Sequence, residues 1–142
     1  MSSNHALVFG ASGISGWNTL VQALSHPTPT TFASITGVTN RPINKADALL
    51  PDDERITLVS GIDLSLTPED AIEALKTKVP RIAEITHVFF YAYIHEPKGE
   101  SLRVANARIV ENALAALKRL TPRLKHFVLQ TGGKVRQQPI FG

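Results

Sequence analysis

Short apolar runs alternate with longer amphipathic stretches along this chain. The apolar runs have the length of β-strands and occupy residues 5–10, 32–40, 56–59, 86–94 and 124–133. Strands that are covered on both faces of a parallel sheet are continuously apolar, and these runs match that description. Apolar residues recur three or four positions apart in residues 14–24, 67–78 and 100–120, so these stretches predict helices.

The order of these elements predicts the fold class. Thr67 precedes Pro68 and two acidic residues, Glu69 and Asp70, which is typical of a capped helix N-terminus. Strands that alternate with helices predict an α/β fold with a parallel sheet covered on both faces. We expect a doubly wound, Rossmann-like sheet of five strands in the order 3-2-1-4-5. Residues 1–134 would form this Rossmann-like domain, and residues 135–142 a short atypical tail.

Composition narrows the partners and the chemistry. The chain has 142 residues, the length of one domain, and a formal net charge of +3. No basic run accompanies that charge, which argues against nucleic acid and is compatible with an anionic ligand such as a nucleotide. Cysteine is absent, so disulfides, thiolate catalysis and cysteine-ligated zinc are excluded, and we predict no metal site. Without a recognisable signal peptide or membrane-spanning run, we expect a cytoplasmic protein with no membrane partner.

Three evenly spaced glycines follow the first predicted strand. Gly10, Gly13 and Gly16 stand between an apolar run and an amphipathic run. In a dinucleotide-binding turn, such glycines permit the tight turn, admit the pyrophosphate close to the backbone and let the helix lie near the sheet. The alternative is a glycine-rich turn that only packs. In the cofactor interpretation, free backbone amides would face the phosphates. These amides belong to Ser12, Gly13, Ile14 and Ser15.

The residues after the second and third predicted strands indicate which dinucleotide would bind. NAD enzymes commonly place an acidic residue after the second strand, whereas this chain has Asn40 and Arg41 there. Because an arginine presents a rigid fork suited to a 2′-phosphate, we predict NADP (NADPH); the alternative is a solvated loop arginine. Asp63, after the third strand, would accept from the adenine amino group or would simply cap its own loop.

Several segments together resemble the short-chain dehydrogenase/reductase superfamily, and more narrowly its progesterone-5β-reductase/iridoid-synthase-like (PRISE-like) group. They read GASGISG, TNRP, IDLS, FFYAYI and LKHFVLQTGGK, and the resemblance extends from Leu7 to Lys134. The glycine motif is shared across the superfamily, and the stretch LQTGGK is more typical of this group. The resemblance implies an oxidoreductase that uses NADPH to reduce the double bond of an enone.

The resemblance also implies roles for individual residues. Those that match cofactor-contacting positions are Gly10, Ser12, Gly13, Ile14, Asn40, Arg41, Asp63 and Leu64. Tyr91 and Ala92 would lie near the nicotinamide half of the cofactor. Lys134 matches the group's catalytic lysine, which would hold the nicotinamide ribose and favour the phenolate form of a tyrosine. Thr131 takes a position where many relatives carry a catalytic hydroxyl; hydrogen bonding at the strand end is the alternative.

The chain also departs from the pattern of that group. Lys134 is followed by Val135 and Arg136 rather than by a histidine and a tyrosine, and the group's catalytic tyrosine would lie beyond Gly142. The later strands and the substrate region of the fold would be missing as well. His95, in the loop after the fourth predicted strand, is a candidate general acid near neutral pH; the alternative is a loop histidine without a chemical role.

Three functions therefore stay open. The first is NADPH-dependent reduction of an enone-type small molecule. The second is a pseudoenzyme or scaffold that keeps the Rossmann module without turnover. The third is an enzyme redirected to cofactor-independent isomerisation or cyclisation, with His95 or Lys134 as the acid or base. In each case the fifth predicted strand would form an apolar edge, which predicts a homo-oligomer or docking of a partner protein there.

Overall fold

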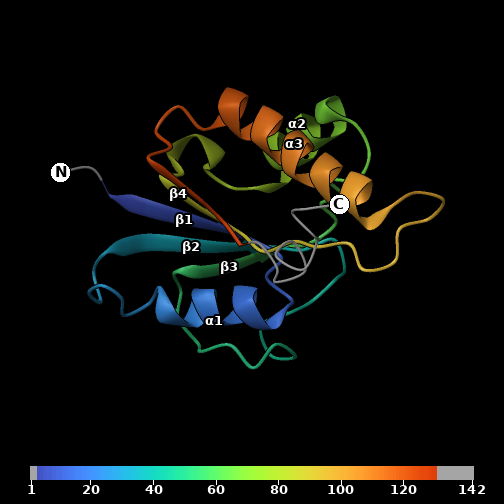
Figure 1. Ribbon diagram of the computed structural model, residues 1–142. Helices are drawn as coiled ribbons and strands as arrows, with labels where there is room; N and C mark the ends of the chain where they lie inside the picture. The colour runs from blue at the N-terminus through green and yellow to red at the C-terminus, as the bar shows by residue number, and fades with distance from the viewer. Residues whose placement is uncertain (1–2, 131–142) are drawn as a thin grey trace, which may run out of the picture.

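The computed structural model describes residues 3–130, which form three layers around a parallel sheet (Figure 1). The elements in chain order are β1 (Asn4–Phe9), α1 (Ile14–Gln22), β2 (Phe32–Val38), β3 (Ile56–Val59), α2 (Pro68–Lys78), the 3-10 turn η1 (Ile82–Glu84), β4 (His87–Phe90), α3 (Leu102–Leu120) and β5 (His126–Leu129). The strand order is β3-β2-β1-β4-β5. Helix α1 covers one face of the sheet, and α2 and α3 cover the other. The predicted fold class and strand order are confirmed.

Two apolar clusters form the core, one on each side of the sheet. Leu7 and Phe9 of β1 belong to the cluster beneath α2 and α3, while Ala6 and Val8 belong to the cluster beneath α1. Successive side chains of a strand point to opposite faces. Since all four side chains are buried, β1 reads as a continuous apolar run instead of an alternating one.

Side-chain caps fix the starts of two helices. The hydroxyl of Thr67 accepts a hydrogen bond from the Asp70 amide at 3.1 Å, and Pro68 is the first residue of α2, as the sequence predicts. The hydroxyl of Ser101 accepts from the Val104 amide at 3.1 Å at the start of α3. Each cap satisfies an amide that has no acceptor inside its helix.

The last two strands are shorter than predicted. β4 ends at Phe90 rather than near residue 94, where its partner β1 also ends at Phe9, and further along the chain the backbone of Ile94 hydrogen-bonds with the side chain of Asn106 on α3 instead of with a strand. The helical spacing of Trp17 suggests a core residue, but its indole is only half-buried and donates to the Ala48 carbonyl at 2.7 Å. This bond satisfies the indole N–H and fastens the stretch between β2 and β3 to α1.

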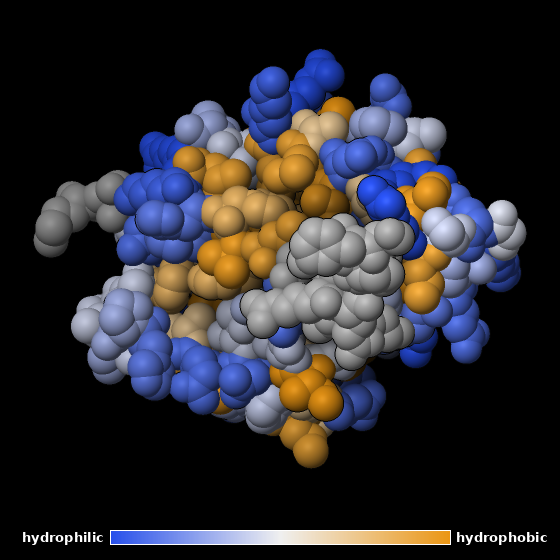
Figure 2. Space-filling view, in the orientation of Figure 1, coloured by the Kyte–Doolittle hydropathy of each residue, from blue (hydrophilic) through white to orange (hydrophobic). Residues whose placement is uncertain are grey.

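Strand β5 lies at one edge of the sheet, as the sequence predicts. Val128 is 44% exposed and Leu129 is 43% exposed. Figure 2 shows apolar side chains gathered on the surface between α3 and α1, where β5 faces the viewer. Association with a second copy or with a partner protein through this edge stays a prediction.

Two histidines at the amino ends of the strands predict how stability depends on pH. Burial, followed by the charge of Arg81, lowers the pKa of His5 below its ordinary 6.5. Burial, followed by the charges of His126 and Lys125, lowers the pKa of His87 from the same value. Just below pH 6.5 the imidazoles of the unfolded chain therefore bind protons that these two folded imidazoles do not. Their contribution to the free energy of unfolding is complete above pH 6.5 and is lost as the pH falls through the pKa values of the folded state.

Acidification from about pH 7.5 to about pH 5.5 should therefore lower the thermal unfolding midpoint. Thermal unfolding followed by circular dichroism checks this, and His87→Gln should make the dependence shallower. A midpoint that rises or stays constant on acidification would contradict this account of the two imidazoles.

Candidate functional site

The three glycines of the β1–α1 turn have different surroundings. Gly10 has φ +78°, and a Cβ on it would lie 2.7 Å from the backbone nitrogen of Ala92. A Cβ on Gly16 would lie 2.1 Å from the carbonyl oxygen of Gly10, so helix and turn pack backbone to backbone there. A Cβ on Gly13 would meet nothing closer than the Gly10 oxygen at 3.6 Å, which is ordinary contact. Gly10 and Gly16 are therefore required by packing, whereas the space beside Gly13 is open.

The first turn of α1 offers unpaired amides to that space. Gly13 is the N-cap and makes no side-chain cap, and no acidic residue lies in the first turn. The prediction that the Gly13 amide is free is wrong, because it donates to the Gly10 carbonyl at 3.1 Å and closes the turn. The amides of Ser12, Ile14 and Ser15 donate to no other described residue. With the positive end of the helix dipole, they form a site that favours an anion.

The turn after β2 presents an arginine. The Thr39 hydroxyl donates to the Arg41 carbonyl at 2.5 Å, and the Gly61 amide donates to the Asn40 carbonyl at 3.1 Å. Arg41 is exposed, and among residues 3–130 its guanidinium makes no hydrogen bond or ion pair. A rigid turn therefore carries a cation whose donors are available to a ligand.

The segment after β3 is held from two sides. One carboxylate oxygen of Asp63 accepts from the Ser65 amide at 2.8 Å and from the Ser65 hydroxyl at 2.5 Å. The side-chain amide of Asn112, buried on α3, donates to the Leu64 carbonyl at 2.8 Å. Asp63 thus caps its own loop, as the alternative interpretation expects, and its other oxygen has no hydrogen-bond partner within residues 3–130.

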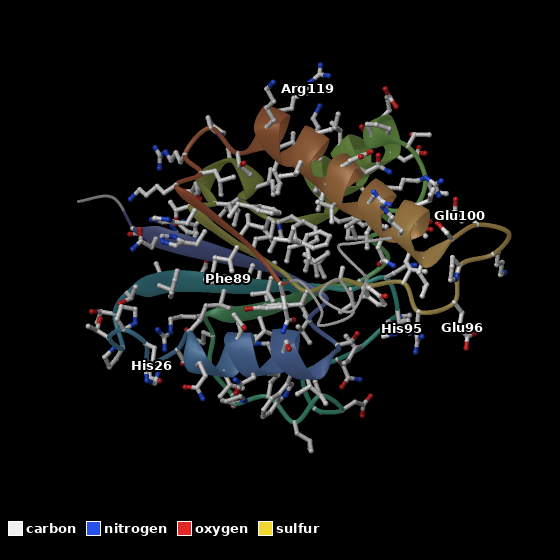
Figure 3. All side chains as sticks on the ribbon, in the orientation of Figure 1. His26, Phe89, His95, Glu96, Glu100 and Arg119 are labelled. Atoms are coloured by element: carbon white, nitrogen blue, oxygen red, sulfur yellow. The ribbon has the colours of Figure 1, made fainter. Side chains whose placement is uncertain are left out.

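The loop from β4 to α3 carries the predicted nicotinamide-side residues. The Tyr91 ring points toward α1, where its hydroxyl oxygen accepts from Thr19 at 2.8 Å. Tyr93 and His95 pack edge to face with ring centroids 4.8 Å apart. Figure 3 shows His95 and Glu96 beyond the carboxyl ends of the strands, at the end of the molecule opposite His26. The carbonyl and amide of Ile94 both bond to the Asn106 side chain, so this loop is anchored just before His95.

These segments enclose one cleft of about 1110 Å³. The predicted site residues that line it are Gly10, Ser12, Gly13, Asn40, Arg41, Asp63, Leu64, Tyr91, Ala92 and His95. Ile14, Ser15 and Gly16 are not among its lining: Ile14 is 90% exposed and Gly16 is buried beneath the turn. Thr131 and Lys134 lie outside the described residues. Residues that the sequence analysis selected from four separate segments therefore share one concave surface.

The carboxyl-edge position of this cleft, at the ends of β1, β2 and β4, is the usual ligand site of an open α/β sheet. A family model described as a PRISE-like Rossmann-fold domain matches residues 6–138. The chain belongs to this PRISE-like family. The resemblance drawn from the sequence motifs is thereby confirmed.

Curated relatives agree with this PRISE-like assignment. The chain is 42% identical over 135 residues to the short chain dehydrogenase ausT of Aspergillus calidoustus and covers 33% of that protein. It is 37% identical over 129 residues to the short chain dehydrogenase sirQ of Leptosphaeria maculans, and 31% identical over 128 residues to an (S)-8-oxocitronellyl enol synthase of Nepeta racemosa. These matches cover 92%, 89% and 89% of this chain. The chain spans about a third of the length of these relatives, at 33%, 33% and 30%.

Solved structures support the fold alone. A short chain dehydrogenase from Salmonella enterica aligns with a TM-score of 0.64 at 13% identity, over 96% of this chain and 61% of that one. A short-chain type dehydrogenase/reductase from Mycobacterium ulcerans aligns with a TM-score of 0.61 at 18% identity, over 91% and 52% of the two chains. Both likenesses concern the arrangement of helices and strands and not the cofactor or the reaction.

Sequence reasoning missed several residues of the PRISE-like cleft. Thr39, Tyr93, Ile94 and Lys98 also line it. Thr39 immediately follows β2, so its place at a strand end was a usable signal. Tyr93 to Lys98 lie in the loop after β4, and only the side chain of Asn106 shows which way that loop turns.

Charges in the cleft are mixed and mostly free. Arg41 and Lys98 are basic, His95 carries an imidazole, and Asp63 and Glu96 are acidic. The ion pairs of the described part of the chain join Arg55 to Asp53, Arg81 to Glu84 and Arg108 to Glu100, and none involves these cleft residues. Residues 3–130 contain no cluster of three or more potential metal ligands, and none of their helices has the length and apolarity to cross a bilayer. The arrangement can hold an elongated anionic ligand along the strand ends.

Proposed function

We propose that this PRISE-like domain binds NADPH and serves the reduction of an enone-type small molecule. The observation that carries the proposal is the juxtaposition, in one cleft, of the uncapped N-terminus of α1 and the unpaired guanidinium of Arg41. A dinucleotide carries a pyrophosphate for the first and, in NADP, a 2′-phosphate for the second. Free amides and a fork-shaped cation are the groups that bind such oxygens.

The residues present are compatible with that cofactor. Open space beside Gly13 leaves room for a pyrophosphate against the backbone, and the amides of Ser12, Ile14 and Ser15 would donate to it. Asn40 and Arg41 would surround the 2′-phosphate, and the second oxygen of Asp63 would accept from the adenine. Leu64 would pack against the base. Tyr91 and Ala92 would bound the nicotinamide end.

The substrate end is assigned to the loop between β4 and α3. NADPH, when bound, supplies the hydride of such a reduction. His95, exposed and packed against Tyr93, would donate a proton to the substrate oxygen. For Lys134 and Thr131 the family pattern alone supports roles at the nicotinamide ribose and at the strand end. A cytoplasmic location and self-association through β5 belong to the same proposal.

Arg41→Ala tests the cofactor assignment. Loss of a charged hydrogen bond should weaken NADPH binding by roughly 1.5–3 kcal/mol, and solvent screening of this exposed side chain favours the lower end. NADH binding should be unchanged because NADH has no 2′-phosphate. Calorimetric titration of both nucleotides measures the two affinities. Equal losses for NADPH and NADH would remove Arg41 from the 2′-phosphate site.

A second candidate function is cofactor binding without turnover, and the hydrogen bond of Tyr91 favours it. The hydroxyl oxygen of Tyr91 already accepts a hydrogen bond from Thr19 on the α1 side of the sheet, away from the substrate loop. A scaffold or pseudoenzyme would bind NADPH and leave it unoxidised with a panel of enones. A cofactor-independent isomerase or cyclase would act without NADPH. Absorbance at the nicotinamide band during such a panel separates a reductase from the other two functions. Product analysis without NADPH then separates an isomerase or cyclase from a scaffold.

A further inference from the structure

Thr39 is a buried threonine in the lining of the cleft. Thr39 is 5% exposed, and its backbone is fixed on both sides: its amide donates to the Val59 carbonyl at 2.9 Å, and its carbonyl accepts from the Ile62 amide at 3.2 Å. Its hydroxyl then donates forward to the Arg41 carbonyl at 2.5 Å. This bond joins the rigid end of β2 to the residue that carries the free cation.

We propose that Thr39 is a positioning residue that sets the direction of the Arg41 side chain and thereby the preference for a 2′-phosphorylated nucleotide. This inference rests on the proposed function of Arg41. The hydroxyl holds the peptide plane after Arg41, and Pro42, which follows, further restricts the backbone of Arg41. With its backbone restricted in both ways, the exposed guanidinium starts from a fixed Cα and loses less conformational freedom when it closes on a phosphate.

The arrangement also separates this role from general packing. Thr39 lines the cleft, but its hydroxyl is directed to Arg41, since its one side-chain hydrogen bond within residues 3–130 goes to that carbonyl. The amides of α1 that would hold the pyrophosphate lie on another segment and are not bonded to the 39–42 turn through this hydroxyl. Loss of the hydroxyl should therefore affect a ligand with a 2′-phosphate and spare one without it.

The experiment compares adenosine 2′,5′-bisphosphate with adenosine 5′-monophosphate, which differ only in the 2′-phosphate. Thr39→Val keeps the shape and removes the donor, and it should weaken binding of the bisphosphate about 3- to 10-fold by calorimetry while changing binding of the monophosphate less than about 2-fold. Thr39→Ser keeps a donor and should restore most of the affinity. Thr36→Val is the matched control: Thr36 is also buried on β2, and its hydroxyl bonds to no other described residue. It should leave both affinities unchanged.

A double-mutant cycle decides whether Thr39 acts through Arg41. In an Arg41→Ala background, Thr39→Val should no longer affect the bisphosphate, because the residue that it orients is gone. Thr39→Ala replaces the valine variant if thermal unfolding shows that the latter does not fold. Equal losses for both nucleotides, or an unchanged effect in the Arg41→Ala background, would overturn the positioning role while leaving the Arg41 assignment intact. If Arg41→Ala itself fails to discriminate between the two nucleotides, both the proposed cofactor and this inference fall.

Discussion

Replacement of Gly13 by valine is expected to weaken NADPH binding about 100-fold or more without unfolding the protein. In the folded chain the nearest atom to a Cβ at this position is 3.6 Å away, so the side chain has room while the cleft holds solvent. Gly13 also has φ −84°, which any residue adopts. The added methyl groups would stand where the pyrophosphate must approach, so the amides of Ser12 and Ile14 could no longer reach its oxygens.

Calorimetric titration with NADPH and a thermal unfolding curve on the same preparation measure both halves of this prediction. The unfolding midpoint of Gly13→Val should stay near that of the unmodified protein. Unchanged affinity in a folded Gly13→Val variant would place the phosphate site elsewhere in the molecule.

Gly16→Ala is expected to show the opposite behaviour, with a loss of about 3 kcal/mol or more in the free energy of unfolding. A Cβ at Gly16 would lie 2.1 Å from the carbonyl oxygen and 2.7 Å from the carbonyl carbon of Gly10. Both atoms belong to backbone that is itself fixed, since the Gly10 amide donates to the Val38 carbonyl at 3.1 Å. Relief therefore requires α1 to move away from the sheet, which opens the apolar contacts beneath it.

Urea unfolding at equilibrium measures that loss. The matched control is Gly13→Ala, three residues earlier in the same motif, which should cost less than about 1 kcal/mol because it alters only an N-cap. Similar losses in the free energy of unfolding for the two alanine variants would refute the claim that packing requires Gly16 and not Gly13.

The sequence was sufficient for the fold because its signals were local and agreed with one another. The run Ala6 to Phe9 is apolar at every position and stands before a glycine, and the structure buries it at the centre of the sheet. Thr67 and Pro68 mark a helix start that needs no distant partner. Element ends were less predictable, because the stretch after Phe90 leaves the sheet and is bound at Ile94 by Asn106, a residue 16 positions beyond the end of β4.

The candidate site was predictable where it follows from strand ends and not where it depends on tertiary hydrogen bonds. Gly10, Asn40 and Asp63 each follow a strand, and parallel strands bring their carboxyl ends to one edge. The hydrogen bond from the Gly13 amide to the Gly10 carbonyl forms only within the folded turn, and no pattern in the sequence predicts it. The Thr39 hydroxyl likewise acquires its role only once its backbone is fixed to β3 and its loop.

The account depends most on the claim that the start of α1 binds the phosphates of a nicotinamide dinucleotide. Two-dimensional amide NMR spectra of the isotope-labelled protein, recorded during titration with NADP⁺, test it directly. The account predicts that the largest shifts fall on the amides of Ser12, Ile14 and Ser15, with smaller shifts at Asn40 and Arg41. Spectra in which these amides do not move at saturating NADP⁺, or in which the largest shifts fall at the amino ends of the strands, would contradict it.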